Sequence, residues 1–284
     1  MTEMRAVQSF ASVRKEELAG LRGVCLDIDD TLSTHGKLTA EAYGALWKLK
    51  SAGFYVVPIT GRPAGWCDHI ARFWAVDAVV GENGAFTLFM QGGPGVQGGI
   101  LRRLETVVGE TGEPASRVRR ARLEQLGVAI RARFPHAKWA SDQAYRDYDL
   151  AIDFCEDVPA WTSSDVAELV RLCEREGAHA KVSSIHVNAW FGDYDKLTGF
   201  KKWREQAGES HVPSFDEWIF IGDSPNDEPL FRAFGASVGV ANLLPFLSGA
   251  GVGGRTMHAP KWITSAKSGA GFVEMAEKLI ESRV

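Results

Sequence analysis

Short apolar runs alternate with helical patterns in the first third of the chain. The runs 24–26, 54–59 and 78–80 are apolar and lead into polar or turn-forming residues, as buried strands of a parallel sheet do. Residues 40–52 carry apolar positions at helical spacing, and residues 64–74 are also helical in pattern. This alternation of strand, loop and helix predicts an α/β fold with a doubly wound parallel sheet.

The pattern changes near residue 90. Residues 91–99 are rich in glycine and predict a turn-rich hairpin or linker. Residues 118–134 and 163–176 then have helical patterns, and residues 149–154 and 181–191 alternate between apolar and polar. Alternation of apolar and polar residues is typical of strands with one solvated face. We therefore predict a small α+β domain at residues 100–189.

The sheet pattern resumes after this segment. Residues 196–206 and 271–283 have helical patterns, and residues 218–221 and 236–240 have the pattern of short buried strands. The sheet domain is therefore expected to comprise residues 1–99 and 190–284, with the α+β domain inserted between them.

The composition is that of an ordinary globular protein. At 284 residues, 45% apolar and 24% charged, the chain can bury the core of one large or two modest domains. A formal charge of −4 gives no electrostatic reason to expect nucleic acid or an anionic membrane as a partner. The sequence indicates no particular oligomeric state.

The cysteines and the apolar segments favour a cytoplasmic protein. The four cysteines show neither a CxxC pair nor metal-type spacing, which favours reduced thiols. The N-terminal segment has no long apolar stretch, so no signal peptide is expected. The uncharged run 233–254 contains Pro245 and several glycines, which favours a strand, a turn and a short helix over a membrane span.

Three carboxylates follow the predicted strand at residues 24–26. Asp27, Asp29 and Asp30 would repel one another and resist burial unless a cation or a catalytic task keeps them there. Asp27 and Asp29 lie on the same side of an extended segment, because side chains alternate with period two. In open α/β sheets, ligands bind beyond the carboxyl ends of the strands, where these residues lie. The alternative is an acidic loop that caps a following helix.

Three more segments carry polar residues at strand ends or domain joins: Thr60 with Gly61, Lys196, and Asp223 with Asp227. Taken alone, Thr60 with Gly61 could be a helix cap, Lys196 a surface lysine, and the segment with Asp223 and Asp227 a turn. Together they supply what phosphoryl transfer through an aspartate requires. These parts are a carboxylate nucleophile, a second carboxylate as acid and base, a hard cation, and a lysine and a hydroxyl for the phosphoryl oxygens.

This set of motifs resembles the haloacid dehalogenase superfamily of phosphatases. The similar subgroup has a large cap inserted between its second and third motifs and includes Cof-like, sucrose-phosphate and mannosyl-phosphoglycerate phosphatases. Its four motifs correspond to residues 27–32, 60–62, Lys196 and 222–227, and residues 83–85 and 269–272 are also similar. The resemblance covers nearly the full chain and implies a Rossmann-like core with the inserted α+β domain as the cap.

The resemblance implies a role for each carboxylate. Asp27 would be the nucleophile, and Asp29 would be the general acid and base, with its backbone carbonyl on Mg²⁺. Asp27 and Asp223 would be Mg²⁺ ligands, and Asp227 would bind the ion or orient Lys196 and a metal-bound water.

The resemblance also implies a phosphate-binding set. Thr60, Gly61 and Lys196, together with Asp27, would hold the phosphoryl oxygens. Many members of the capped subgroup have Gly where this chain has Asp30. Other members of the superfamily accept Asp there, so this departure casts little doubt on catalysis.

The reaction implied is hydrolysis of a phosphomonoester with Mg²⁺ as cofactor, through an aspartyl-phosphate. The substrate would be a small phosphorylated metabolite such as a sugar phosphate. Asp29 supports this reaction, because dehalogenases of the superfamily lack an acid at that position. A phosphomutase shares the same residues and stays open as an alternative. A non-catalytic phospho-ligand binding protein is less favoured because the motif residues are intact, and a receiver domain is too short.

The predicted cap carries candidate substrate contacts. Ser184, His186 and Asn188 share one face of a strand under the period-two rule and could bind sugar hydroxyls. Lys181 or Arg146 could meet a second anionic group. The competing interpretation is a solvated outer face of the sheet.

Overall fold

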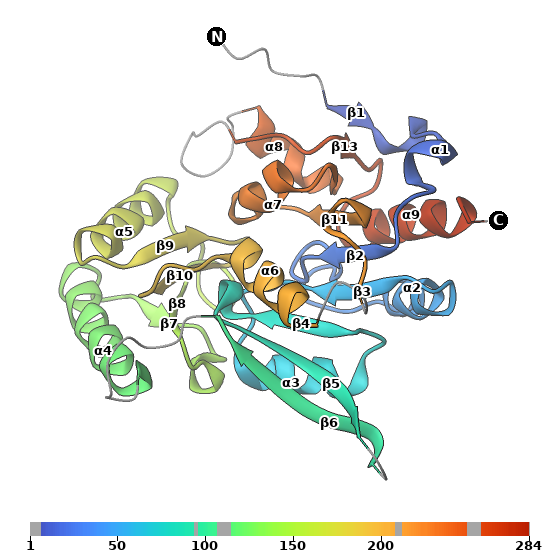
Figure 1. Cartoon of the computed structure of the whole chain (residues 1–284). Helices are drawn as coiled ribbons and strands as arrows, with labels where there is room; N and C mark the ends of the chain where they lie inside the picture. The colour runs from blue at the N-terminus through green and yellow to red at the C-terminus, as the bar shows by residue number, and fades with distance from the viewer. Residues whose placement is uncertain (1–6, 94–95, 107–114, 208–211, 249–256, 284) are drawn as a thin grey trace.

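The computed structural model describes residues 7–93, 96–106, 115–207, 212–248 and 257–283. These residues form a six-stranded sheet, a three-stranded sheet and a four-stranded sheet (Figure 1). The predicted α/β fold with a parallel sheet is confirmed.

The six-stranded sheet is parallel throughout. Its order is β1-β13-β12-β11-β2-β3. The strands are β1 (Gln8–Ser9), β2 (Gly23–Leu26), β3 (Tyr55–Pro58), β11 (Trp218–Gly222), β12 (Ala236–Gly239) and β13 (Trp262–Ile263). β2 and β11 lie side by side in its interior, so the loops that follow these two strands meet at one edge of the sheet.

Helices cover both faces of this sheet, which explains why β2 and β11 in its interior are buried at every position. Val24 and Leu26 of β2 contribute to one hydrophobic core, and Cys25 between them contributes to the other. The first core includes side chains of α2 (Ala40–Ser51) and α9 (Ser268–Glu281), and the second those of α6 (Lys196–Ala207) and α7 (Glu228–Ala233). The short helices are α1 (Lys15–Leu18) and α8 (Leu244–Leu247).

A three-stranded sheet extends from the β3 edge. Its strands are β4 (Ala78–Gly81), β5 (Phe86–Gly93) and β6 (Val96–Glu105), and α3 (Ala64–Phe73) packs against β4 and β5. Ile59 forms a parallel bridge with Val80, which connects this sheet to the central one. The glycine-rich segment falls in the β5–β6 hairpin, although residues 94–95 lie outside the described part. β6 continues past residue 99, so the expected domain boundary falls within this strand.

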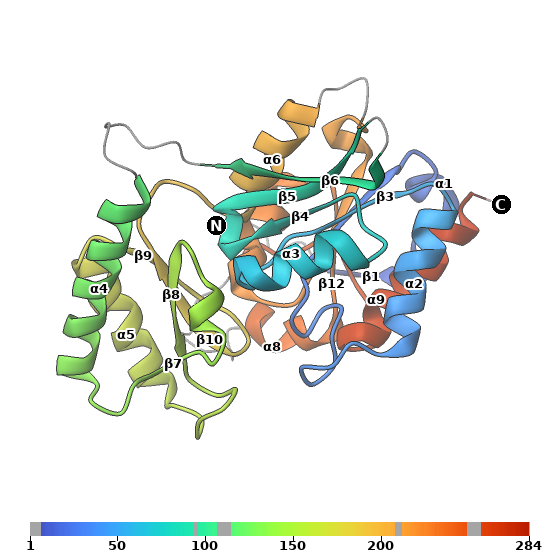
Figure 2. The same ribbon diagram turned by 90° about the horizontal axis from the view of Figure 1, so that it is seen from below.

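The four-stranded sheet belongs to a unit that we call the insert (residues 115–190). Its order is β7-β8-β10-β9, and all its pairings are antiparallel. The strands are β7 (Lys138–Trp139), β8 (Asp149–Asp153), β9 (His179–Val182) and β10 (His186–Trp190), and the helices are α4 (Ala115–Arg133) and α5 (Ser163–Arg175). The helices cover the outer face of this sheet, and its other face is turned toward the rest of the molecule (Figure 2).

Glu82 joins the insert to the rest of the chain. Its buried carboxylate accepts hydrogen bonds from the backbone N–H of Asp147 at 2.9 Å and of Tyr148 at 2.5 Å, both in the insert. It also accepts one from the backbone N–H of Ala64 at 3.0 Å. A buried carboxylate is tolerated where several donors satisfy it. Glu82 therefore fixes one end of the insert against α3.

Some predicted boundaries move by a few residues. The closing helix begins at Ser268 and ends at Glu281, and the segment 181–191 contains the end of β9, a turn and β10. Within the uncharged run, β12 and α8 form as expected, and residues 249–256 lie outside the described part. Among the described residues, no helix is both long enough and apolar enough to cross a membrane.

Candidate active site

Three buried carboxylates meet beyond the carboxyl ends of β2 and β11. Asp27 directly follows β2, and its backbone N–H donates to the carbonyl of Ile221 in β11 at 3.0 Å. Asp223 directly follows β11, and Asp227 lies in the 3₁₀ turn after it. One oxygen from each of the three carboxylates lies within 4.8 Å of the others. Residues nearly two hundred positions apart therefore form one acidic cluster.

Lys196 enters this cluster from the first turn of α6. Its Nζ lies 2.6 Å from Oδ1 of Asp27 and 2.7 Å from Oδ1 of Asp227. Two glycines allow the close approach of α6. A Cβ at Gly84, where φ is +105°, would lie 1.9 Å from the carbonyl oxygen of Asp195, and a Cβ at Gly199 would lie 2.7 Å from the carbonyl oxygen of Gly84.

The cluster contains three carboxyl groups and one ammonium group. Burial raises the pKa of Asp27 to about 7, although Lys196 opposes this shift. Burial also raises the pKa of Asp223 well above its usual value, and the neighbouring carboxylates add to the effect. Burial alone would lower the pKa of Lys196, but Asp227 and Asp27 raise it. Three buried carboxylates around one ammonium group form a donor set that suits a hard divalent cation such as Mg²⁺.

Asp29 lies beside this cluster and is held by Arg62. Nη2 of Arg62 lies 2.7 Å from Oδ1 of Asp29, and Nε of Arg62 lies 2.9 Å from Oδ2. Arg62 also lies 3.3 Å from Asp142 and 3.2 Å from Glu156, both in the insert. The sequence placed Arg62 in the second motif but did not predict these contacts. The expected contact of the Asp29 carbonyl with Mg²⁺ stays a prediction.

Thr60 and Gly61 lie at the same edge of the sheet. Thr60 is fully buried, and its hydroxyl oxygen accepts a hydrogen bond from the backbone N–H of Arg62 at 3.0 Å. The carbonyl of Gly61 accepts a hydrogen bond from Arg146 at 2.8 Å. Asp30 adopts a left-handed backbone conformation with φ of +54°, a region that favours glycine.

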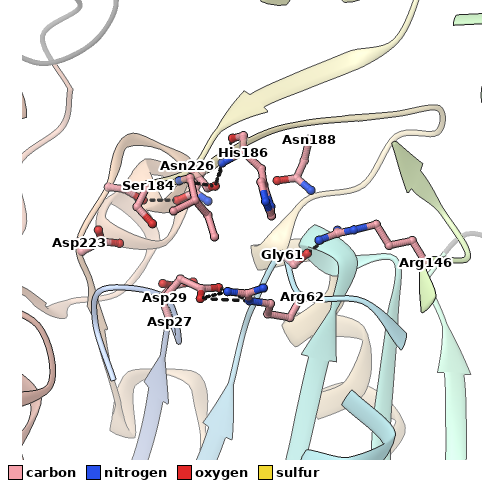
Figure 3. Close-up of a pocket in the computed structure, with 13 residues that line it drawn as sticks. Asp27, Asp29, Gly61, Arg62, Arg146, Ser184, His186, Asn188, Asp223 and Asn226 are labelled. Carbon is pink, nitrogen blue, oxygen red and sulfur yellow. Dashed lines mark hydrogen bonds and ion pairs between the residues drawn. The ribbon is translucent and has the colours of Figure 1, made fainter. Parts of the chain in front are cut away.

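The insert provides the opposite wall of a pocket over the cluster. Figure 3 shows Ser184, His186 and Asn188 facing the pocket from β10 and the turn before it, with Asp27 and Arg62 on the other side. Nε2 of His186 lies 2.9 Å from Glu156, in an electrostatic contact that is not aligned as a hydrogen bond. Ser224 and Asn226 of the fourth motif complete the lining, and the sequence did not single them out.

The other two expected cap contacts, Arg146 and Lys181, do not face the pocket with a free charged group. Arg146 lines the pocket, but its guanidinium group is already paired with Asp142 at 2.9 Å and with Asp149 at 3.0 Å. Lys181 is exposed on β9 and is not part of the described pocket lining. A contact of either residue with a second anionic group stays a prediction. Asn188 also donates a hydrogen bond to Asp149, at 2.8 Å.

The pocket over the cluster is nearly closed. Its free volume is about 20 Å³, which is room for about one water molecule. A wider pocket of about 350 Å³ adjoins it, which we call the outer pocket. The two pockets share Asp29, Arg62, Ser184 and Ile185 as lining residues. A substrate in the outer pocket would therefore lie next to Asp29, and entry of a phosphoryl group would require the insert to move.

Comparison with known proteins gives a match to one family and several solved structures with a similar fold. Residues 24–95 match the family of haloacid dehalogenase-like hydrolases. The C-terminal domain of trehalose-6-phosphate phosphatase from C. albicans has a TM-score of 0.65 at 11% identity, over 97% of this chain and 98% of that one. A haloacid dehalogenase-like hydrolase from Bacteroides thetaiotaomicron has a TM-score of 0.59 at 15% identity, over 91% and 99% of the two chains.

Sucrose-phosphatase from Synechocystis, in complex with sucrose and phosphate, has a TM-score of 0.57 at 15% identity, over 91% of this chain and 97% of that one. No curated protein matches the sequence. The family match contains the first two motifs, and the fold agrees over at least 91% of the chain. The family match thereby confirms the resemblance to the haloacid dehalogenase superfamily over residues 24–95, and the solved structures show a similar fold for the rest of the chain.

Proposed function

We propose that the protein is a Mg²⁺-dependent phosphomonoesterase that acts on a small phosphorylated metabolite through an aspartyl-phosphate intermediate. The observation that supports this most directly is the contact of Lys196 with both Asp27 and Asp227 beside Asp223. The structural similarity to trehalose-6-phosphate phosphatase and sucrose-phosphatase supports a sugar phosphate as the substrate class.

The first step forms a bond between phosphorus and a carboxylate oxygen of Asp27, and the bond to the leaving oxygen breaks. Lys196 holds Oδ1 of Asp27 and neutralises charge on the phosphoryl oxygens, with the hydroxyl of Thr60 and the backbone near Gly61. Asp29 gives its proton to the leaving alkoxide. A Mg²⁺ ion on Asp27 and Asp223, with Asp227 beside them, would reduce the repulsion between the phosphate and these carboxylates.

The second step releases phosphate. Asp29 takes a proton from a water molecule that attacks phosphorus, and the bond between phosphorus and Asp27 breaks. Arg62 contacts both carboxyl oxygens of Asp29, and the carboxylate that the first step leaves on Asp29 is the form that acts as the base. Arg62 thereby orients Asp29 for this step. The insert acts as the cap, because it covers the pocket and excludes water from the first step.

The test is phosphate release from p-nitrophenyl phosphate and from a panel of sugar phosphates, with Mg²⁺ and with EDTA. We expect turnover with Mg²⁺, loss of turnover with EDTA, and recovery when Mg²⁺ is added back. Metal-independent hydrolysis would contradict the proposed role of Asp223. Product analysis with a hexose monophosphate distinguishes a phosphatase, which releases phosphate, from a phosphomutase, which yields an isomer.

A further inference from the structure

The guanidinium groups in the pocket are already matched by carboxylates. Arg62, whose side chain is 6% exposed, contacts Asp29, Asp142 and Glu156. Arg146, whose side chain is 1% exposed, contacts Asp142 and Asp149. These two cations therefore lie among four carboxylates, because Asp142 is shared between them. The positive charge of each guanidinium group is therefore already balanced by carboxylates before a substrate binds.

The outer pocket, where the leaving group would lie, is also rich in carboxylates. Asp29, Asp30 and Glu156 line it, against the single guanidinium group of Arg62 and the imidazole of His35. Glu156 is the carboxylate that the insert contributes to this lining. The contact with His186 lowers the pKa of Glu156 to about 2. Burial alone would raise this pKa, and Arg62 lowers it further. Glu156 is therefore ionised at neutral pH, and a second anion placed beside it would be repelled.

Uncharged polar groups are available in the same place. Ser184 lines both pockets, and its hydroxyl is buried without a well-formed hydrogen bond in the described structure. Asn188 and Asn226 add amide groups to the adjoining pocket over the cluster, and Ser33 adds a second hydroxyl to the outer pocket. The outer pocket of about 350 Å³ also lies within the size range of small-ligand sites. Hydroxyl groups would be bound here, whereas a second anion would meet no lysine or arginine in the described lining that lacks a carboxylate partner.

We propose that the leaving group of the substrate is uncharged, as in the monophosphate of a neutral sugar or polyol, and that Glu156 rejects leaving groups with a second phosphate or a carboxylate. This proposal rests on the proposed phosphatase function. It concerns the choice among phosphate esters and leaves the chemical step unchanged. Glu156 acts through its charge, since it lines the leaving-group side of the site rather than the carboxylate cluster.

The test compares two esters that differ in one charge, phenyl phosphate and 4-carboxyphenyl phosphate. We expect kcat/KM to be at least about tenfold higher for phenyl phosphate, because the carboxylate of the other ester meets Glu156 and Asp30, and the one guanidinium group in the described lining is already paired. Glucose 6-phosphate and 6-phosphogluconate form a second pair with the same contrast. Equal turnover within a pair, or faster turnover of the acid, would overturn the proposal. If no ester is hydrolysed, the phosphatase function itself fails.

Variants separate charge from structure. Glu156→Gln should reduce the ratio between the two aryl esters by at least about threefold, whereas Glu156→Asp, which keeps the charge, should retain the discrimination. The control is Asp157→Asn, which removes the same charge from an exposed neighbour outside the described pocket lining. An unchanged ratio in Glu156→Gln, or an equal change in Asp157→Asn, would show that Glu156 does not set the specificity.

Discussion

Lys196 and Asp27 are in direct contact, with Nζ of the lysine 2.6 Å from Oδ1 of the aspartate, although 169 positions separate them in the sequence. Both side chains are buried, and Lys196 makes a second contact with Asp227. A buried ammonium group between two carboxylates stabilises all three charges together. Lys196 therefore contributes both to the fold and to the proposed binding of the phosphoryl group.

Lys196→Met should affect both properties. We expect kcat/KM for p-nitrophenyl phosphate to fall by about 10²- to 10⁴-fold, because charge on the phosphoryl oxygens is no longer neutralised. The free energy of unfolding should fall by about 3 kcal/mol, because two buried carboxylates lose their partner. Turnover assays and urea unfolding measure the two effects. Wild-type turnover in a folded variant would contradict the role given to Lys196.

Gly84→Ala should displace the start of α6. The new Cβ would lie 1.9 Å from the carbonyl oxygen of Asp195, and the positive φ adds backbone strain. We expect a loss of at least about 2 kcal/mol in unfolding free energy and a large loss of turnover, because Lys196 follows Asp195 directly. Gly20→Ala is the control, since no described atom lies within 4 Å of its Cβ position. Equal behaviour of the two variants would count against this packing argument.

Arg62→Lys should lower kcat more than it changes stability. Lysine keeps the positive charge but cannot form the two-pronged contact that fixes the carboxylate of Asp29. We expect kcat to fall by about tenfold or more, with a circular dichroism spectrum like that of the wild type. A kcat equal to that of the wild type would mean that Asp29 needs no orientation by Arg62.

The contribution of Glu156 to stability should depend on pH. Its pKa is lowered to about 2 in the folded protein, so the ionised carboxylate stabilises the fold above the usual value of 4.5. This stabilisation is lost as the pH falls from 4.5 toward 2. Allowing for solvent screening, we expect about 1 kcal/mol between the wild type and Glu156→Gln at pH 6. Urea unfolding should show this difference shrinking by pH 3.5, and a difference that grows there would contradict the prediction.

The sequence predicts the central sheet and the carboxylate cluster because both follow from local patterns. Val24 and Leu26 belong to an uninterrupted apolar run, and Asp27 and Asp223 each follow such a run directly. Parallel strands have their carboxyl ends at one edge, so these two aspartates were expected to meet if their strands are neighbours. Lys196 was predicted only through its place among the family motifs, since a single lysine carries no local signal.

The contacts between the insert and the sheet could not be predicted. Arg62 meets Asp142 and Glu156 only because of how the insert packs over the sheet, and no periodicity in the sequence encodes that placement. Glu82 bonds to backbone N–H groups of the insert, which any residue could supply. The division of the chain into a catalytic core and an inserted cap, with the boundary that β6 crosses, remains our proposal.

The most direct test of the account is the turnover of p-nitrophenyl phosphate by Asp27→Asn, compared with the wild type in the presence of Mg²⁺. Asparagine keeps the shape of the side chain but removes the nucleophilic carboxylate. We predict that kcat falls by at least about 10³-fold while the circular dichroism spectrum and thermal unfolding show a folded protein. Near-normal turnover in Asp27→Asn would contradict the proposal that this carboxylate attacks phosphorus.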